Sequence, residues 1–432
     1  MSENKRKFDA KHTFLIGLAF FSSALAWDMY DSQVSLSLYG YLAGIGLTGL
    51  LLGLDNLVGV IVQPIMGNVS DNTRTKLGRR MPYILIGIPL GALFFALIPF
   101  ETSLISLLIF MFLFIVSMSM WRSQAVSLMP DFVHPENRSK GNAIINVMGG
   151  LGLVGSTLIS YTIVDISLQL AFIVVSVIML LSLIVLFFTV KEKDSYAYQA
   201  LLAEEKDAGE KIKNKKDKIS LISSFKDIIK EEDKSTLFVL LAIFFAMLAY
   251  YGLMGLFTIY AQNIFSMTRG QAGGIKLYAG LTFLVAAFPL SLLAEKFGRK
   301  LFIKIGLVIF IIGALIGFSI PTKTVVTISL VLLGVGYACI VVNTIVIVWA
   351  LAPSEKKIGT YTGVYYAFSF LAAIIAPGIF EGLAILFTWN AFFLIGAFFL
   401  VVALVLMFLV KRESPDLTEE QKMAKKKAIQ EL

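Results

Sequence analysis

Long runs of apolar residues alternate with short charged segments along most of the chain. Many of these runs reach the roughly 20 residues that an α-helix needs to cross a bilayer. The pattern predicts twelve transmembrane helices in two groups of six, separated by a polar stretch at 191–235. The predicted spans lie near 13–38, 44–67, 82–100, 103–128, 140–164, 168–190, 236–262, 270–294, 301–319, 324–350, 357–384 and 387–410.

Composition supports this all-α polytopic membrane class. Of 432 residues, 57% are hydrophobic and 15% charged, whereas a soluble protein carries about 25% charged residues. Cys339 is the single cysteine, so no disulfide can form within the chain. The charged N-terminus and the length of the first apolar run do not resemble a cleaved signal peptide.

The distribution of Lys and Arg predicts the orientation. These residues gather in the N-terminus, in alternate loops and in the C-terminal tail, whereas the opposite loops hold only Arg269 and Lys323. We therefore expect both termini on the cytoplasmic side of the cell membrane, inner or plasma. The net charge of +8 then reflects topology and gives no reason to expect nucleic-acid binding. The expected organisation is a cytoplasmic N-terminus (1–12), a six-helix bundle (13–190), a linker (191–235), a second bundle (236–410) and a cytoplasmic tail (411–432).

The linker has one segment with a helical pattern. "KIKNKKDK" (211–218) is locally basic, and "ISLISSFKDIIK" after it places Ile219, Ile222, Phe225 and Ile229 at helical spacing. This pattern predicts an amphipathic helix on the inner leaflet. A solvated linker without fixed structure is the alternative.

The most specific motif is "GNVSDNTRTKLGRRMPYI" (67–84), between the second and third spans. Gly67 allows close helix approach, Asp71 ends a helix, Gly78 allows a tight turn, and Arg79 and Arg80 follow. A carboxylate near arginines and a helix end predicts a breakable conformational latch. The alternative is that the arginines are only topological charges. A second copy, "AEKFGRK", carries Glu295 and Arg299.

These strings resemble the signature loop of the major facilitator superfamily. The longer gap between Asp71 and Gly78 resembles the glycoside–pentoside–hexuronide:cation symporter family, and "GVIVQPIMGNVSD" (59–71) is similar to its sucrose/maltose–proton branch. The resemblance implies two six-helix bundles around a central cavity and transport by alternating access. It covers the whole chain in topology, but in sequence it is strong only from about residue 51 to 90.

One departure bears on the coupling ion. In the melibiose branch, two carboxylates of the second span help to bind sodium, and alignment on "QPIMG" places Gly59 and Gln63 at those positions. The resemblance therefore implies that this sodium site is missing. Asp55 lies one and two turns further toward the outside, which favours coupling to protons.

Six ionisable residues lie within the predicted spans away from their cytoplasmic ends. Lys276 and Glu381 lie near the outer ends, where we expect them to reach interfacial water. The others, Asp28, Asp31, Asp55 and Arg122, are deeper, where a charge costs at least about 2.5–3.5 kcal/mol. Asp165 lies at an outer helix end, and we expect no special role for it, as for Lys276 and Glu381.

Arg122 facing a carboxylate of the first span suggests a coupling mechanism. A carboxylate beside a guanidinium stays ionised, and it takes up a proton when that contact is lost and the group is buried. If substrate hydroxyls compete for Arg122, substrate and proton binding become linked. We expect Asp28 to accept the proton, with Asp31 or Asp55 as alternatives. A purely structural ion pair is the competing interpretation.

Sugar sites combine amides and carboxylates with aromatic platforms. Aromatic residues are also ordinary at bilayer interfaces, so each alone is a weak indication. The candidate substrate-binding residues are Trp27, Gln33, Trp121, Gln124, Asn146, Tyr251, Asn343 and Tyr365.

The expected function is secondary active transport of a sugar, glycoside or similar small polar solute with protons. We find no nucleotide loop, metal-ligand cluster or nucleophile beside a base, so we expect no enzyme, no metal and no cofactor. The expected partners are a small-molecule substrate, protons and the bilayer, with the protein acting as a monomer. Alternatives are a proton-coupled exporter of amphipathic compounds, a lipid or lysolipid carrier, and a non-transporting receptor or scaffold. "NVMGGLGLVGS" (146–156) lacks the proline that often marks exporters of that kind.

Overall fold

The computed structural model describes residues 8–43, 46–134, 137–208, 228, 233–352 and 358–412. Within these residues, 12 helices are long and apolar enough to cross a membrane, which confirms the predicted spans. The described part holds no β-sheet, and its β pairing is a single bridge between Thr75 and Gly78. The all-α class is therefore confirmed.

The helices follow one another along the chain with short connections. Those before the linker are α1 (Ala10–Leu42), α2 (Thr48–Leu52), α3 (Leu54–Asp71), α4 (Met81–Leu97), η1 (Ile98–Phe100), α5 (Leu104–Phe132), α6 (Arg138–Ile159), η3 (Ser160–Val164), α7 (Leu168–Thr189), η4 (Glu192–Asp194) and α8 (Tyr196–Ala208). Those after it are α10 (Ser235–Phe265), α11 (Arg269–Gly274), α12 (Leu277–Phe297), α13 (Arg299–Ser319), α14 (Lys323–Leu351), α15 (Ile358–Phe387), η6 (Trp389–Ala391) and α16 (Phe392–Leu409).

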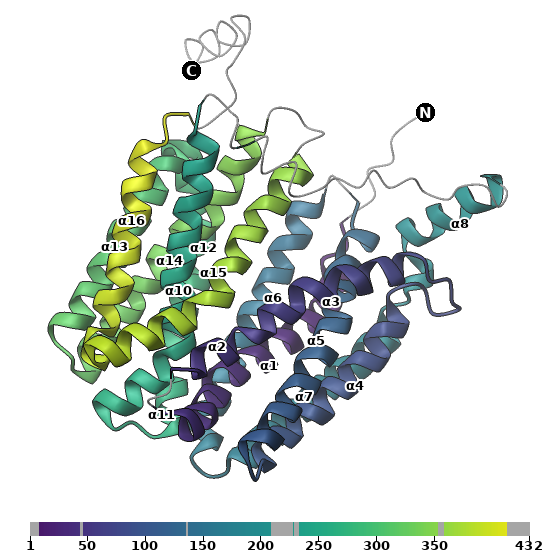
Figure 1. Cartoon of the computed structure of the whole chain (residues 1–432). Helices are drawn as coiled ribbons and strands as arrows, with labels where there is room; N and C mark the ends of the chain where they lie inside the picture. Colours follow the sequence, from purple (N-terminus) through teal and green to yellow (C-terminus); the bar gives the residue numbers. More distant parts are fainter. Residues whose placement is uncertain are drawn as a thin grey trace, which may run out of the picture.

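The helices form two groups that stand side by side, with α1 to α7 in the first half and α10 to α16 in the second (Figure 1). We call the end at which α1 begins and α16 finishes the terminal end, and the opposite end the far end. The halves lean apart toward the terminal end. At the far end they meet, where α2 packs against α15 and α11 against η3.

The second and eighth spans are each built from two helices. Gly53 separates α2 from α3, and Ile275 and Lys276 separate α11 from α12. The two short helices α2 and α11 both contact the other half, as the longer pairs α1 with α10 and α6 with α12 also do. The hydropathy pattern predicts both spans but not their interruption, because neither break contains a proline.

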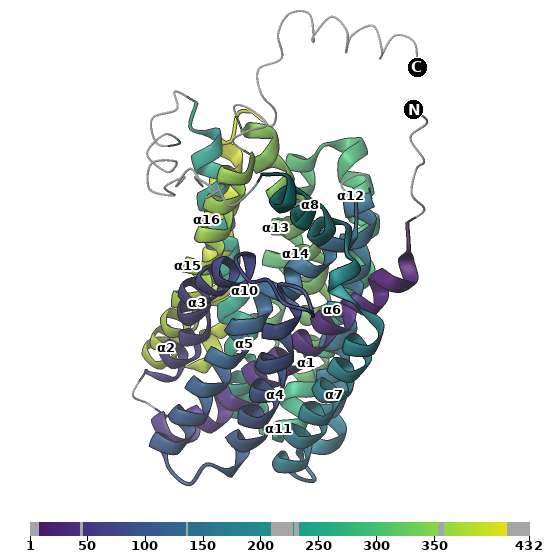
Figure 2. The ribbon, with the colours of Figure 1, turned by 90° about the vertical axis from the view of Figure 1, so that its right-hand side faces the viewer.

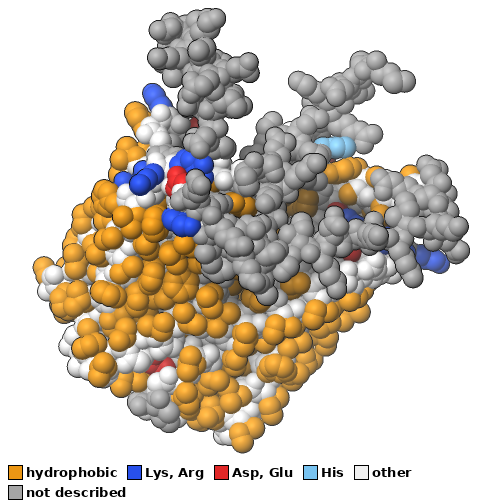
Figure 3. All heavy atoms as spheres, turned by 45° about the horizontal axis from the view of Figure 1, so that its top comes forward, with side chains coloured by type: hydrophobic (Ala, Val, Ile, Leu, Met, Phe, Trp, Pro, Cys, Tyr) orange, Lys and Arg blue, Asp and Glu red, His pale blue; other side chains and the backbone are white. Residues whose placement is uncertain are grey.

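The outer surface of the bundle is apolar, as contact with lipid requires. Large hydrophobic side chains such as Ile105, Phe188 and Phe288 are about 70% exposed. Figure 3 shows hydrophobic side chains over most of the visible flank, whereas described Lys and Arg side chains gather near the terminal end. This division matches a protein that spans a bilayer.

The polar linker starts with structure that the sequence did not predict. η4 and α8 follow α7 directly. At the terminal end, α8 projects to one side of the bundle in Figure 1 and lies in front of the bundle in Figure 2. The hydroxyl of Tyr198 donates to the backbone oxygen of Thr75 at 3.3 Å, which ties α8 to the loop after α3. The amphipathic helix predicted around 219–229 lies outside the described residues, apart from Ile228.

Candidate functional site

A cavity of about 530 Å³ lies between the two halves. Its wall includes residues of α1 from Ala19 to Asp31 and of α6 from Ile145 to Thr157, and it reaches α10, α12 and α14 of the second half. The ionisable side chains that line it are Asp28, Asp31, Asp55, Arg122, Lys276, Tyr250, Tyr251 and Tyr337. The four residues expected to couple protons therefore share one cavity.

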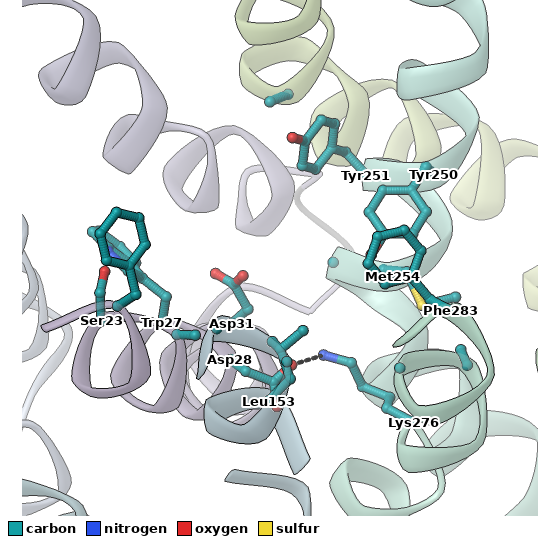
Figure 4. A pocket seen from close by; sticks show the side chains of 18 of the residues that line it. Ser23, Trp27, Asp28, Asp31, Leu153, Tyr250, Tyr251, Met254, Lys276 and Phe283 are labelled. Carbon is teal, nitrogen blue, oxygen red and sulfur yellow. Dashed lines mark ion pairs between the residues drawn. The ribbon is translucent and has the colours of Figure 1, made fainter. Parts of the chain in front are cut away.

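One ion pair crosses this cavity from half to half. The ammonium of Lys276 lies 3.3 Å from a carboxylate oxygen of Asp28, and both side chains are largely buried. Figure 4 shows the two side chains pointing toward each other from α1 and the start of α12. The other Asp28 oxygen, Oδ2, is buried and has no hydrogen-bond partner in the described part of the chain. The pair thus links the halves and leaves one oxygen open to a proton.

The expectation that Lys276 reaches interfacial water is wrong. It was expected near the outer end of its span, within reach of water, but it is 7% exposed and faces inward. The reason is the break between α11 and α12, because the chain turns there and directs Lys276 toward α1. The pair expected between Arg122 and Asp28 is not formed in this conformation, because Lys276 holds the carboxylate instead.

Arg122 is the second cation of the cavity. Its side chain is exposed, and no ion pair or hydrogen bond is found for it among the described residues. It lies within range of an electrostatic interaction with both Asp31 and Asp55. Asn56 donates its amide to Asp55 at 2.7 Å. The guanidinium therefore stands free beside two carboxylates, where a ligand can reach it.

Aromatic rings form much of the remaining wall. In the first half, Trp27 packs against Phe114 at 5.3 Å between ring centroids. In the second half, Tyr250 and Tyr337 stack at 3.6 Å with an angle of 5°. Tyr337 also contacts the Phe283 ring. Flat apolar faces thus stand close to the charged groups on both sides of the cavity.

Four of the candidate substrate-binding residues line the cavity, namely Trp27, Trp121, Asn146 and Tyr251. The other four do not line it, and their polar groups contact other parts of the protein.

The two glutamines that lie outside the cavity each donate to another helix. Gln33 donates to Ser160 at 3.2 Å and to the backbone oxygen of Arg269 at 3.3 Å. Gln124 donates to the backbone oxygen of Met66 at 2.9 Å.

Asn343 and Tyr365 likewise contact polar side chains of other helices in the second half. Asn343 is fully buried and accepts a hydrogen bond from Arg299 at 3.1 Å. The Tyr365 hydroxyl lies 3.2 Å from that of Thr344.

The motif at 67–84 forms a charged cluster at the terminal end. Arg80 pairs with Asp71 at 2.6 Å, and Arg79 pairs with Asp131 at 2.7 Å. Gly78 has a φ of 110°, which permits the turn that brings both arginines to α5. Gly67 has open space beside its Cα in this conformation, so no close helix approach requires it here. In this state the predicted latch residues connect α3 and α5 within one half.

Sequence reasoning missed Glu192 as a member of this cluster. Its carboxylate is 1% exposed and accepts the backbone N–H groups of Arg79, Arg80 and Met81 at 2.7–3.0 Å. These groups open α4, so Glu192 acts as its cap. Burial raises the pKa of Glu192, and the three hydrogen bonds oppose that rise. In the sequence, "KEKD" resembles an ordinary solvated segment.

The second copy of the motif is simpler. Arg299 bonds Asn343 on α14, which parallels the contact of Arg79 with Asp131 on α5. Glu295 is exposed, and no partner is found for it among the described residues. The two halves therefore share the link between the motif and the neighbouring long helix, but only the first half has the full set of ion pairs among the described residues.

We expect Glu192→Ala to destabilise the protein by about 3 kcal/mol, because it leaves three backbone N–H groups at the start of α4 without their acceptor. Thermal unfolding of the purified protein in detergent would measure this. Asp194→Ala removes an exposed carboxylate two residues away and is the matched control. Equal melting temperatures for the two variants would contradict the capping role.

Comparison with known proteins agrees with the topology and the paired halves. The family model described as Major Facilitator Superfamily matches residues 16–275 and 239–432. No curated protein is similar enough in sequence to match this chain.

Solved transporters share the fold at low sequence identity. A bacterial homolog of the human lysosomal transporter Spinster, inward-facing and occupied, has 14% identity, covers 96% of this chain and 98% of its own, and superposes with a TM-score of 0.73. A point mutant of the nucleoside transporter NupG has 13% identity, coverage of 93% and 100%, and a TM-score of 0.73. A POT family transporter in complex with a thioalcohol-conjugated peptide has 16% identity, coverage of 92% and 96%, and a TM-score of 0.66. With the family model matching most of its length, this chain belongs to the major facilitator superfamily.

Proposed function

We propose that this protein is a secondary active transporter that takes up a sugar, glycoside or similar small polar solute together with protons, by alternating access. The observation that carries this proposal is the Asp28–Lys276 pair, which joins the two halves inside the cavity. A transporter must change the contacts between its halves when it changes the side to which the cavity opens. Charges placed on that boundary are positioned to make the change depend on a proton.

The coupling step is the protonation of Asp28. Ionised Asp28 holds Lys276 and so favours the closed far end. A proton on Asp28 removes the charge that attracts the ammonium, which weakens the link between α1 and α12. The free oxygen Oδ2 is the atom that would take the proton. In this scheme Asp31 and Asp55 remain alternative proton carriers, with Arg122 controlling their charge.

The composition of the cavity wall supports a polar cargo with apolar faces. The rings of Trp27 and Tyr251 offer platforms, while Asn146, Arg122 and the carboxylates offer hydrogen-bonding groups. Sugars and glycosides match this combination, because they present hydroxyl groups together with flat C–H surfaces. The low similarity to transporters of nucleosides and peptides gives the fold, and the substrate class is argued from these residues.

The orientation also remains part of the proposal. With the termini in the cytoplasm, the contacts of α2 with α15 and of α11 with η3 at the far end, where the helices do not lean apart, support an inward-facing state. The charged cluster of Arg79, Arg80, Asp71 and Asp131 then lies on the cytoplasmic face. We propose that it rearranges when the terminal end closes.

Transport into proteoliposomes tests the function. A thermal-shift screen of the purified protein against sugars and glycosides first selects a ligand, and its radiolabelled form is then offered with an inward proton gradient. For symport of one proton per solute, we expect accumulation of about tenfold per unit of pH difference, abolished by a protonophore. Flux that follows sodium and ignores pH would overturn proton coupling. Outward transport of amphipathic compounds or lipids, with no sugar uptake, would favour the alternative functions.

A further inference from the structure

The two short helices at the far end repeat one pattern. In α2, Gly49 is followed four residues later by Gly53, and in α11 Gly270 is followed four residues later by Gly274. In both halves the second glycine is followed two residues later by an ionisable residue of the cavity wall, Asp55 in the first half and Lys276 in the second. Each short helix therefore connects the far end directly to the central cavity.

A carboxylate of the second half holds α2. Glu381 on α15 is 0% exposed, and its Oε2 accepts the backbone N–H of Gly49 at 2.7 Å. Its second oxygen is buried without a hydrogen-bond partner in the described residues. The sequence-based expectation that Glu381 reaches interfacial water is therefore wrong, because α2 covers it. A buried carboxylate needs such a partner, so loss of this contact between the halves is strongly unfavourable while the carboxylate stays buried.

A carboxylate of the first half holds α11 in the same way. Asp165, in the turn between η3 and α7, accepts the backbone N–H of Gly270 at 2.8 Å through Oδ1. Its Oδ2 accepts the hydroxyl of Thr268. Gln33 of α1 adds a bond to the backbone oxygen of Arg269 at 3.3 Å. Asp165 and Glu381 thus occupy equivalent places, each at the outer part of the fifth span of its own half.

The glycines of both short helices lie against the opposite half with no space for a side chain. A Cβ on Gly49 would collide with the backbone of Pro377 in α15. A Cβ on Gly270 would lie 2.6 Å from the backbone oxygen of Ser160, and one on Gly273 would lie 2.7 Å from the Ser160 hydroxyl. Such close approach leaves no room for water between the short helices and the opposite half, so these contacts close the far end.

We propose that Glu381 and Asp165 are the gating residues of the far end: each carboxylate holds a short helix of the opposite half, and both must release for the cavity to open there. This inference rests on the proposed alternating access but not on the substrate or the coupling ion. Because Asp55 and Lys276 follow α2 and α11 by three and two residues along the chain, a change of charge in the cavity can act on the same helices that the gate holds. A movement of either short helix would therefore also move a charged residue of the central cavity.

Accessibility of a single cysteine tests the gate without any transport measurement. The native Cys339 is replaced by alanine, and Met254→Cys on the cavity wall serves as the reporter. A membrane-impermeant maleimide is applied to proteoliposomes from either face. In the parent we expect labelling from the terminal end. In Glu381→Gln and in Asp165→Asn we expect the ratio of far-end to terminal-end labelling to rise about tenfold each, and further in the double variant.

Asp194→Asn is the matched control, because it neutralises an exposed carboxylate at the terminal end, and it should label like the parent. Thr268→Val removes the hydroxyl that donates to Asp165 while keeping every charge, and we expect a smaller shift in the same direction. This variant also keeps the test decisive if a carboxylate variant does not fold. Folded variants that label like the parent from both faces would overturn the gate, even if proton-coupled uptake is confirmed. A shift in labelling without sugar uptake would support the gate and count against the proposed cargo.

Discussion

Replacing Lys276 with methionine is expected to lower proton-driven accumulation by about 100-fold. Methionine keeps the length and apolar stem of the lysine but leaves Asp28 buried without its cation. Breaking a buried ion pair by removing one partner costs about 3–5 kcal/mol, which corresponds to two or more orders of magnitude in an equilibrium. Asp28 would then bind a proton persistently, so that the proton gradient no longer drives a cycle. Uptake into proteoliposomes under an imposed pH gradient measures the loss.

Two further variants separate coupling from folding. In Lys276→Met combined with Asp28→Asn, neither residue of the pair leaves a buried charge without its partner, so we expect the melting temperature to recover while proton-driven uptake stays absent. Exchange of labelled for unlabelled substrate without a gradient should persist in this double variant. Lys323→Met removes an exposed cation at the far end and should transport normally. Proton-driven accumulation by the double variant would show that the pair is only structural.

The architecture was predictable because the information that fixes it is local. Each span requires only a sufficiently long apolar stretch, and the bias of Lys and Arg marks alternate loops. The motif at 67–84 also predicted contacts correctly at short range: Asp71 and Arg80 pair because the turn at Gly78 returns the chain to the end of α3. These features depend on residues that are neighbours in the sequence.

The central ion pair was not predictable from depth in the span. Lys276 and Glu381 lie near the outer ends of apolar runs, where a charged side chain normally reaches water. Both are buried instead, because short helices of the far end fold over them or turn them inward. The breaks at Gly53 and Ile275 cause this, and neither break contains the proline that would announce it in a sequence. Hydropathy therefore predicts the span but not the direction of its charges.

The choice of amides failed for a related reason. Gln33, Gln124 and Asn343 were selected because an amide in an apolar run needs partners. These amides do have partners, but the partners are polar groups of other helices: Ser160, the backbone of Met66, and Arg299. A single sequence does not record which helix lies opposite. It can identify a polar group that must be satisfied, but it does not distinguish a ligand from a neighbouring helix as the group that satisfies it.

Arg122→Gln is the second variant for which we expect a large effect. Arg122 has no ion pair among the described residues and stands within electrostatic range of Asp31 and Asp55. An adjacent cation favours the ionised form of a carboxylate, so proton release from either acid depends on where the guanidinium points. A substrate that takes hydrogen bonds from Arg122 would draw it away from these acids. Substrate binding and proton binding would thus favour each other.

If Arg122 binds the substrate as we propose, its loss removes charge-assisted hydrogen bonds to the substrate and this link to the acids. Such bonds contribute about 1.5–3 kcal/mol each, so we expect the ligand Kd to rise at least about tenfold and proton-driven accumulation to fall in parallel. Arg122→Lys keeps the charge but lacks the planar guanidinium, so it should retain part of the ligand affinity and part of the proton-driven accumulation. Lys191→Gln, which removes an exposed cation outside the cavity, is the control. Calorimetric titration with the ligand from the thermal screen gives Kd for each variant. If Kd and accumulation are unchanged in Arg122→Gln, Arg122 has no part in coupling. Asp28 and Lys276 would then remain as the coupling pair, because they contact each other directly.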